Sequence, residues 1–294
     1  MGNDAETLLN RIGDLPPLPA IALRVMRAAD DPQTSAMDLA QILQTDQALT
    51  AKLIHISNSA YYGFARRVGT VREAVVLLGF KQVRQVAVGL SLMSMFRTTR
   101  VSSDRFNLDL FWGHSVAVAV AAEALAKNAR VVRPEDAFTA GILHDIGRLV
   151  LRHVMPGEFE EAVRMACETG MPLGLAELET TGFAHDEIGQ ALSERWQFPS
   201  HLVEAVGRHH DQRLTPENDG IPGVVAQANR LALHYGLYCG YDIVDGVAGD
   251  PGRVPHELQR AEAACGGIDR VLKRAFTFME LASGAPKQRY ADAA

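Results

Sequence analysis

The sequence is poor in several residue types and patterns that mark particular protein classes. Only three cysteines occur among 294 residues, widely spaced and in no CxxC pair, so neither a disulfide scaffold nor a structural zinc–thiolate site is expected. No apolar run reaches the roughly 18 residues of a membrane-spanning helix, so we expect no membrane association. The first ten residues carry acids where a signal peptide has a basic start and an apolar middle, which favours a cytoplasmic protein.

A basic surplus is also missing. The chain has 29 Lys and Arg against 35 Asp and Glu, a net charge of -6, which argues against nucleic acid as a partner. Charged residues make up only 22% and hydrophobic residues 47% of the sequence, and this balance excludes a disordered chain. The length suits a globular protein with one large core or two smaller ones.

Strand patterns bounded by hairpin turns are absent, whereas helical periodicity is common. No proline lies between Pro32 and Pro134, and that span is rich in Ala, Leu and Val at helical spacing. Three helices are expected there: one capped by Thr34 or Ser35, one over about 47–58 and one from about Lys81. The sequence therefore predicts an all-α fold.

Breaks in the helical pattern suggest how the chain is organised. A polar segment at 97–104 separates an N-terminal helical subdomain (1–100) from a second helical domain with a C-terminal extension (101–294). Further breaks are expected around Pro156, at 171–182 and at 214–223. The Gly- and Asp-rich segment 241–255 is expected to be a long loop, and the tail from Gly284 to be frayed.

Five of the ten histidines fall on apolar helical faces. His114 shares a stripe with Phe111 and Val118, and His185 is in phase with Ile188 and Leu192. His209 and His210 follow Val206 by about one turn. His144 and Asp145 lie in a segment that is apolar nearly all round, and Asn229 is in phase with Val225. A buried carboxylate is costly unless it meets a cation or a metal.

Each of these residues also has a simple structural interpretation. A lone histidine on an apolar face is commonly a hydrogen-bonded core residue, and Asp145 can pair with Arg148 one turn later. His209 and His210 can form a polar helix end, and His185 can begin a helix. These interpretations weaken jointly, because five imidazoles and a carboxylate face inward from separate helices. Nitrogen and carboxylate ligands suit Zn, Mn, Fe or Ni.

The order H, then HD, then H, then HH, then a late polar residue resembles the HD superfamily of metal-dependent phosphohydrolases. The closer resemblance is to its signalling branch, the HDOD domain (HD-related output domain), over roughly residues 12–235. The segments that carry the resemblance are LPPLPAIALRVM, NSAYYGF, LLGF, FWGHS, GILHDIGRL, HDEIGQAL, RHHD and ANRLA. It implies an N-terminal helical subdomain packed on an HD-like helical core, and a regulatory or interaction role in bacterial signalling.

The resemblance also implies a ligand set for a divalent transition metal (Fe, Mn, Ni or Zn). The matching positions are His114, His144, Asp145, His185, His209, His210 and, at the late acid position, Asn229. If the site were active, Asp145 and Arg148 would be the catalytic residues.

Several positions depart from the pattern of the hydrolases. Asn229 is a neutral carboxamide where an acid is expected, and Ala232 stands where cyclic-dinucleotide phosphodiesterases have a second acid. Arg148 replaces lysine, Leu110 stands where trinuclear members carry an extra acidic ligand, and DQRLTP after RHH does not match the GYP-type signature. With one carboxylate, the site would neutralise two divalent ions poorly.

We therefore predict a bacterial signal-transduction module with a vestigial, catalytically idle metal site. It would act through a signalling protein partner or through a bound ligand such as a nucleotide or cyclic dinucleotide. The alternative is a metal-dependent phosphohydrolase (phosphodiesterase) that cleaves such a ligand, and a third candidate is a sensor that binds a nucleotide without cleavage. Asn229 and Ala232 favour binding over turnover.

Overall fold

A computed structural model describes residues 18–59, 62–97, 105–130, 133–241 and 254–283. Every regular element in these ranges is a helix, so the predicted all-α fold is confirmed. The N-terminal ten residues, most of the break at 97–104, most of the loop at 241–255 and the tail from Gly284 lie outside the described residues. The predictions made for those segments stay predictions.

The described chain divides into two compact units. One lies within 16–98 and also takes residues from Lys273 onward, and the other lies within 99–272. We refer to them as the N-terminal unit and the central unit. The division predicted at residue 100, with all of 101–294 in one domain, stays a prediction.

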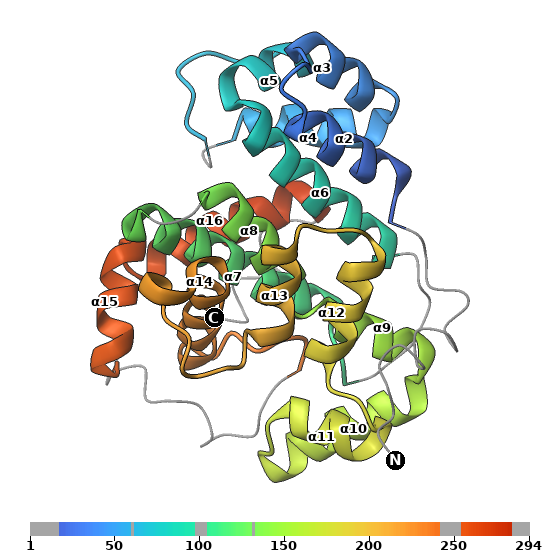
Figure 1. The fold of residues 1–294 in the computed structure, drawn as a ribbon, viewed down its shortest axis with the longest axis vertical. Coiled ribbons are helices and arrows are strands. Elements are labelled where there is room, and N and C mark those ends of the chain that lie inside the picture. Colours follow the sequence, from blue (N-terminus) through green and yellow to red (C-terminus); the bar gives the residue numbers. More distant parts are fainter. Residues whose placement is uncertain (1–17, 60–61, 98–104, 131–132, 242–253, 284–294) are drawn as a thin grey trace. The chain divides into compact units, whose positions relative to one another are not determined.

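The N-terminal unit is a bundle of short helices (Figure 1). They are α2 (Ala20–Asp30), α3 (Ala36–Gln44), α4 (Gln47–Ser57), α5 (Val71–Leu78) and α6 (Phe80–Arg97). Ser35 begins α3 with a capping box, in which its hydroxyl accepts from the Asp38 N–H and the Asp38 carboxylate accepts in return. Gly79 separates α5 from α6 and has a positive φ of 83°.

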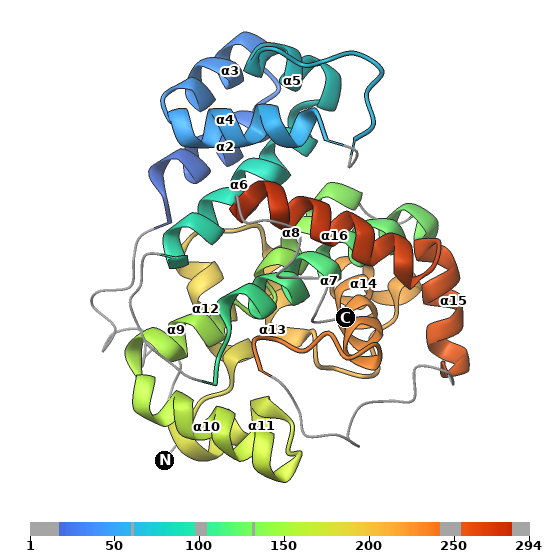
Figure 2. The same ribbon diagram turned by 180° about the vertical axis from the view of Figure 1, so that it is seen from behind.

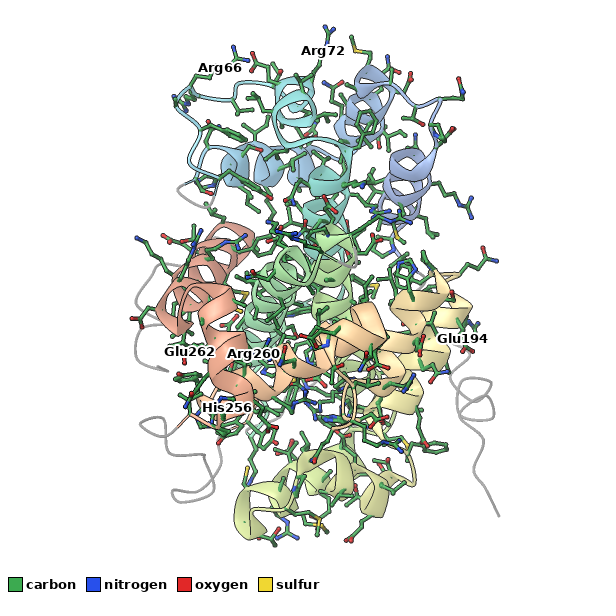
Figure 3. The ribbon with its side chains drawn as sticks, turned by 60° about the vertical axis from the view of Figure 1, so that its left-hand side comes forward. Arg66, Arg72, Glu194, His256, Arg260 and Glu262 are labelled. Carbon is green, nitrogen blue, oxygen red and sulfur yellow. The ribbon has the colours of Figure 1, made fainter. Side chains whose placement is uncertain are left out.

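The central unit is built around α7 (Leu108–Ala129), which packs on α8 (Pro134–Leu143) and α14 (Pro216–His234). Around them lie the remaining helices of this unit (Figures 1 and 2). They are α9 (Ile146–Val154), α10 (Pro156–Thr169), α11 (Leu173–Thr181), α12 (His185–Arg195), α13 (Ser200–Arg208), α15 (His256–Cys265) and the start of α16 (Ile268–Ser283). Glu194 on α12 and Arg260 on α15, both labelled in Figure 3, are exposed.

Helix α7 is long and apolar enough to cross a membrane by length and composition alone, but 72% of its most apolar window is buried inside the protein. In the described chain, α5 and α6 pass the same test only when taken together, and they are bent by 120° at their junction. Phe111, Trp112 and Val116 of α7 are among its buried residues. The apolar character of α7 is therefore used in the core of the central unit.

Two predicted breaks differ from the structure. The segment 171–182 is mostly helix α11, because Leu173 and Ala176 bury a helical face although Pro172 and Gly182 flank it. The segment 214–223 contains the start of α14, which is kinked at Gly220 (φ 57°, ψ -126°). Prolines and glycines thus lie at the ends and at the kink of these helices, but the sequence pattern did not predict the helices themselves.

The contact between α9 and α12 depends on a glycine. A Cβ built on Gly147 would lie 1.9 Å from the backbone oxygen of His185 and 2.8 Å from the nitrogen of Gly189. Both obstacles are main-chain atoms, which cannot rotate away. Gly147 therefore lets α9 approach α12 closely enough to bring the residue before α9, Asp145, towards His185.

We expect Gly147→Ala to destabilise the protein by more than about 2 kcal/mol, because overpacking against backbone exceeds the gain in helix propensity of about 1 kcal/mol. Gly157→Ala is the matched control, since Gly157 is also helical and its Cβ would meet nothing within 4 Å. Urea unfolding of both variants measures the difference. Equal stability of the two variants would contradict this account of the α9–α12 contact.

Candidate metal centre

Four buried imidazoles are each held by a hydrogen bond from Nδ1 to an oxygen. The acceptors are Leu237 O for His114 (2.6 Å), Gly141 O for His144 (2.7 Å), Val206 O for His209 (2.7 Å) and the Glu177 carboxylate for His185 (2.5 Å). Carbonyl and carboxylate oxygens only accept, so Nδ1 carries the proton in each ring. In the neutral ring, Nε2 then presents a lone pair.

Helix ends create two of these hydrogen bonds. His144 and His209 follow the last residues of α8 and α13 and cap those helices. Each ring bonds the carbonyl three residues back, one of the carbonyls that a helix end leaves without a partner. The HD and HH pairs therefore lie where a helix stops, with Nδ1 bound to the helix and Nε2 directed away from it.

The free Nε2 atoms converge on one another. Those of His114 and His144 are 3.1 Å apart, and His185 Nε2 lies 3.3 Å from that of His209 and 2.9 Å from that of His210. Two lone pairs at such distances repel unless a proton or a metal ion lies between them. The Nε2 atoms of the cluster are therefore arranged to share a proton or a metal ion.

Asp145 lies between two groups of imidazoles. Its Oδ2 is 3.2 Å from His144 Nε2 and 3.4 Å from His114 Nε2. Its Oδ1 is 3.0 Å from His185 Nε2 and 3.5 Å from His209 Nε2, but it makes no hydrogen bond of good geometry. In each of two sets, His114–His144–Asp145 and Asp145–His185–His209–His210, the candidate ligand atoms lie within 4.8 Å of one another. The carboxylate can therefore serve one cation or bridge two.

Glu177 is a functional residue that the sequence analysis missed. It is fully buried on α11, where it accepts from Nδ1 and from the backbone N–H of His185 (3.1 Å) and from Arg148 Nε (3.0 Å). The signal was available: Leu173, Ala176, Glu177 and Thr181 are buried at i, i+3, i+4 and i+8. An acid on such a face needs a partner. It was overlooked because the segment was interpreted as a break.

Arg148 joins the two buried carboxylates, with Nη1 2.7 Å from Asp145 Oδ2 and Nε bound to Glu177. The expected pairing of Asp145 with Arg148 is therefore present alongside the imidazole contacts. Two buried carboxylates and one guanidinium leave a net negative charge before the histidines are counted. Among the described residues, Asp145 is the one carboxylate in the two sets that can hold a metal, as expected, and Glu177 is a second buried carboxylate that contacts His185 and Arg148.

These charges set the protonation of the cluster. Burial alone would raise the pKa of Asp145 and of Glu177, but Arg148 and the imidazoles hold both pKa values below the usual range. Burial and Arg148 oppose a charge on His185, yet Glu177 and Asp145 raise its pKa to about 9. Burial lowers the pKa of His209 to about 4. These shifts favour the charged form of His185 and the neutral form of His209 near neutral pH.

A cavity of about 380 Å³ adjoins the cluster. His114, Arg148, His210 and Asn229 line it, together with Cys239, whose pKa is raised by burial. Asn229 is 3% exposed, and its Oδ1 is buried without a hydrogen-bond partner. Cys239 is a free thiol outside the two metal-capable sets, so thiolate ligation is not part of this centre.

The predicted residues thus fall into two groups. Six of them lie in the two sets: His114, His144, Asp145, His185, His209 and His210. The side chain of His210 is exposed overall, although its Nε2 reaches His185. Asn229 lines the adjoining cavity, and Arg148 pairs with Asp145. Their role as ligands or catalytic groups stays a prediction.

Comparisons with known proteins address the family and the fold of the chain. The family model of the HDOD domain matches residues 15–212. An HDOD domain protein of unknown function from Geobacter sulfurreducens is 26% identical, with a TM-score of 0.75 and coverage of 94% of this chain and 96% of that chain. A protein of Shewanella amazonensis, described as a suggested phosphohydrolase, is 24% identical with a TM-score of 0.68, and covers 94% of this chain and 96% of its own.

A suggested signal transduction protein from Marinobacter aquaeolei has a TM-score of 0.70 at 23% identity, over 96% of this chain and 61% of that one. At this identity, and at that of the Shewanella protein, the likeness shows the fold alone. An uncharacterised protein of Treponema pallidum is 26% identical over 72% of this chain, which spans only 41% of that relative's length. The family match covers more than half of the chain, which therefore belongs to the HDOD domain family.

We expect Glu177→Gln to lower the free energy of unfolding by about 3 kcal/mol, because it leaves Arg148 and His185 with a neutral partner in a buried site. Glu179→Gln is the matched control on the exposed face of the same helix and should change stability by less than about 0.5 kcal/mol. Denaturant unfolding without metal measures both. A loss of the same size in both variants would rule out the assigned role of Glu177.

The stability of the metal-free protein should peak near the ordinary histidine pKa of 6.5. Below pH 6.5, this histidine binds a proton in the unfolded chain, whereas folded His209, with its pKa of about 4, does not. The stability therefore falls as the pH falls towards 4. Above pH 6.5, folded His185 keeps its proton up to about pH 9 while the unfolded chain has lost it, so this contribution disappears as the pH rises to 9.

Urea unfolding across this pH range, in the presence of a chelator, tests the profile. His209→Asn should flatten mainly the acid side and His185→Asn mainly the alkaline side. If both variants kept the parent profile, the assigned protonation states would be incorrect.

Proposed function

We propose that the protein is a signal-transduction module in which an HD-type centre binds a divalent transition metal. The bound metal would contact a ligand, and the ligand would not be hydrolysed. The observation that carries the proposal is the convergence of four Nε2 atoms on the two oxygens of Asp145, while Nδ1 of each of these four rings donates outward. Hydrogen-bond acceptors behind the ring fix the tautomer that a metal requires. Membership of the HDOD family supports the signalling role.

The donor set limits the metal. Imidazole nitrogens with one carboxylate suit Fe, Mn, Ni or Zn, and the set holds no thiolate. A bound ion would act as a Lewis acid towards an anionic ligand. Asp145 would hold the ion through one or both oxygens, and Glu177 would keep His185 Nε2 directed at it. Glu177 also lessens the charge problem expected of a site with one carboxylate, since it neutralises Arg148.

The composition of the cavity supports binding over turnover. Among the described residues that line it, none is Asp or Glu, and Asn229 occupies the late position where the hydrolases have an acid. An acid at that position could accept a proton from the attacking water, whereas the carboxamide of Asn229 cannot. Arg148 is occupied by two carboxylates, which reduces its capacity to stabilise charge on a leaving group.

Hydrolysis of a phosphate ester is the second candidate function, and one observation favours it. Asp145 lies between two sets of imidazoles, as a carboxylate that bridges two cations would. A screen of phosphomonoesters and phosphodiesters with the Mn-, Fe- and Ni-loaded protein separates the candidates. Turnover that Asp145→Ala abolishes would favour the hydrolase and overturn the proposed idle centre.

The purified protein should retain about one or two transition-metal ions per chain, measured by elemental analysis after dialysis. His144→Ala should lower metal affinity at least about tenfold, because it removes a ligand. His256→Ala is the control, since His256 is exposed at the start of α15 (Figure 3) and belongs to neither metal-capable set. Asn229→Asp should raise metal affinity by adding an anionic donor beside the centre. Metal-free protein that cannot be loaded would refute the proposal.

A further inference from the structure

The cavity beside the cluster has the composition of a binding site for one small organic molecule. Its volume of about 380 Å³ lies at the small end of ligand pockets, which range from about 300 to 1,000 Å³. His114 and His210 of the cluster line it, as does Arg148. A ligand in the cavity would therefore touch the proposed metal centre directly.

The charge of the cavity fits a single anionic group. Among its described lining residues, Arg148 is the one Lys or Arg, and carboxylates are absent from them. A phosphate placed at the proposed metal centre, beside His114 and His210, would meet the positive charge of the bound ion. A second phosphate in the same cavity would lie against apolar side chains such as Met171 and Leu233, where its desolvation would not be offset.

The remaining walls fit a flat, largely apolar group with some polar edges. Tyr238 and Tyr241 both line the cavity, and their ring centroids are 6.2 Å apart. Aromatic rings of this kind stack on planar ring systems. Asn229 Oδ1 and His234 Nε2 belong to lining residues and are buried without a hydrogen-bond partner. Such atoms can be satisfied by amino or hydroxyl groups of a ligand.

We propose that this cavity binds an organic phosphate with one phosphate group and one planar ring system, of the size of a nucleoside monophosphate, and that it rejects cyclic dinucleotides. The assignment rests on the proposed metal-binding function, since the phosphate would face the metal. The sequence leaves two ligand classes open, nucleotides and cyclic dinucleotides, and this assignment keeps only the first. A cyclic dinucleotide has two phosphates and two bases, whereas the cavity offers a place for about one of each.

Calorimetric titration of the full, Mn-loaded chain tests the assignment. The probes are adenosine monophosphate, guanosine monophosphate, cyclic dimeric guanosine monophosphate and inorganic phosphate. At least one monophosphate should bind at least about tenfold more tightly than the cyclic dinucleotide. Tyr238→Ala should weaken that binding about tenfold through the loss of stacking, while the affinity for inorganic phosphate stays unchanged.

Tyr235→Ala is the matched control, because Tyr235 lies on the same segment but is not among the residues that line the cavity. If Tyr238→Ala does not fold, as judged by thermal unfolding, Tyr238→Leu removes the ring while it keeps apolar volume. Tighter binding of the cyclic dinucleotide, or an unchanged monophosphate affinity in the folded Tyr238 variant, would overturn the assignment.

Metal analysis of the same sample separates the two proposals. Protein that cannot be loaded contradicts the metal centre, whereas loaded protein that binds neither monophosphate contradicts only the ligand assignment.

Discussion

The outward hydrogen bond from each imidazole Nδ1 is the constraint on which the rest of the site depends. Three backbone carbonyls and one carboxylate fix the protons of His114, His144, His209 and His185 on the far side of each ring. Four Nε2 atoms are thereby directed at one small volume that also contains Asp145. In a protein core such an arrangement is unfavourable unless a cation is shared, so the fold is poised to take up a proton or a metal ion.

The buried charges connect this constraint to the surrounding helices. Asp145 begins α9, Glu177 lies on α11, and Arg148 holds both carboxylates by hydrogen bonds. Because Glu177 also bonds His185, the hairpin of α10 and α11 helps to determine where an imidazole of the cluster points. A ligand that contacts Leu173 or Met171 in the cavity would touch the same segment.

Much of this could be predicted from the sequence, and the part that could not has an identifiable physical cause. Helical periodicity indicated the all-α fold, and the register of the histidines on apolar faces indicated their burial. Asp145 was recognised because a carboxylate in an apolar segment requires a partner. Glu177 was missed because Pro172 and Gly182 suggested a loop, and because its partners are distant in sequence. The tautomers depend on Leu237 and Val206 carbonyls, which no residue pattern encodes.

The most direct test of this account is the long-range ¹H–¹⁵N spectrum of the histidine side chains, recorded without metal and after addition of Zn²⁺. We expect His144 and His209 to be neutral with the proton on Nδ1, and His185 to be doubly protonated near neutral pH, in line with its pKa of about 9. Zn²⁺ should then shift Nε2 of the cluster and remove the second proton of His185. A proton on Nε2 of His144 or His209 in the metal-free protein, or Nε2 signals that Zn²⁺ leaves unchanged, would contradict it.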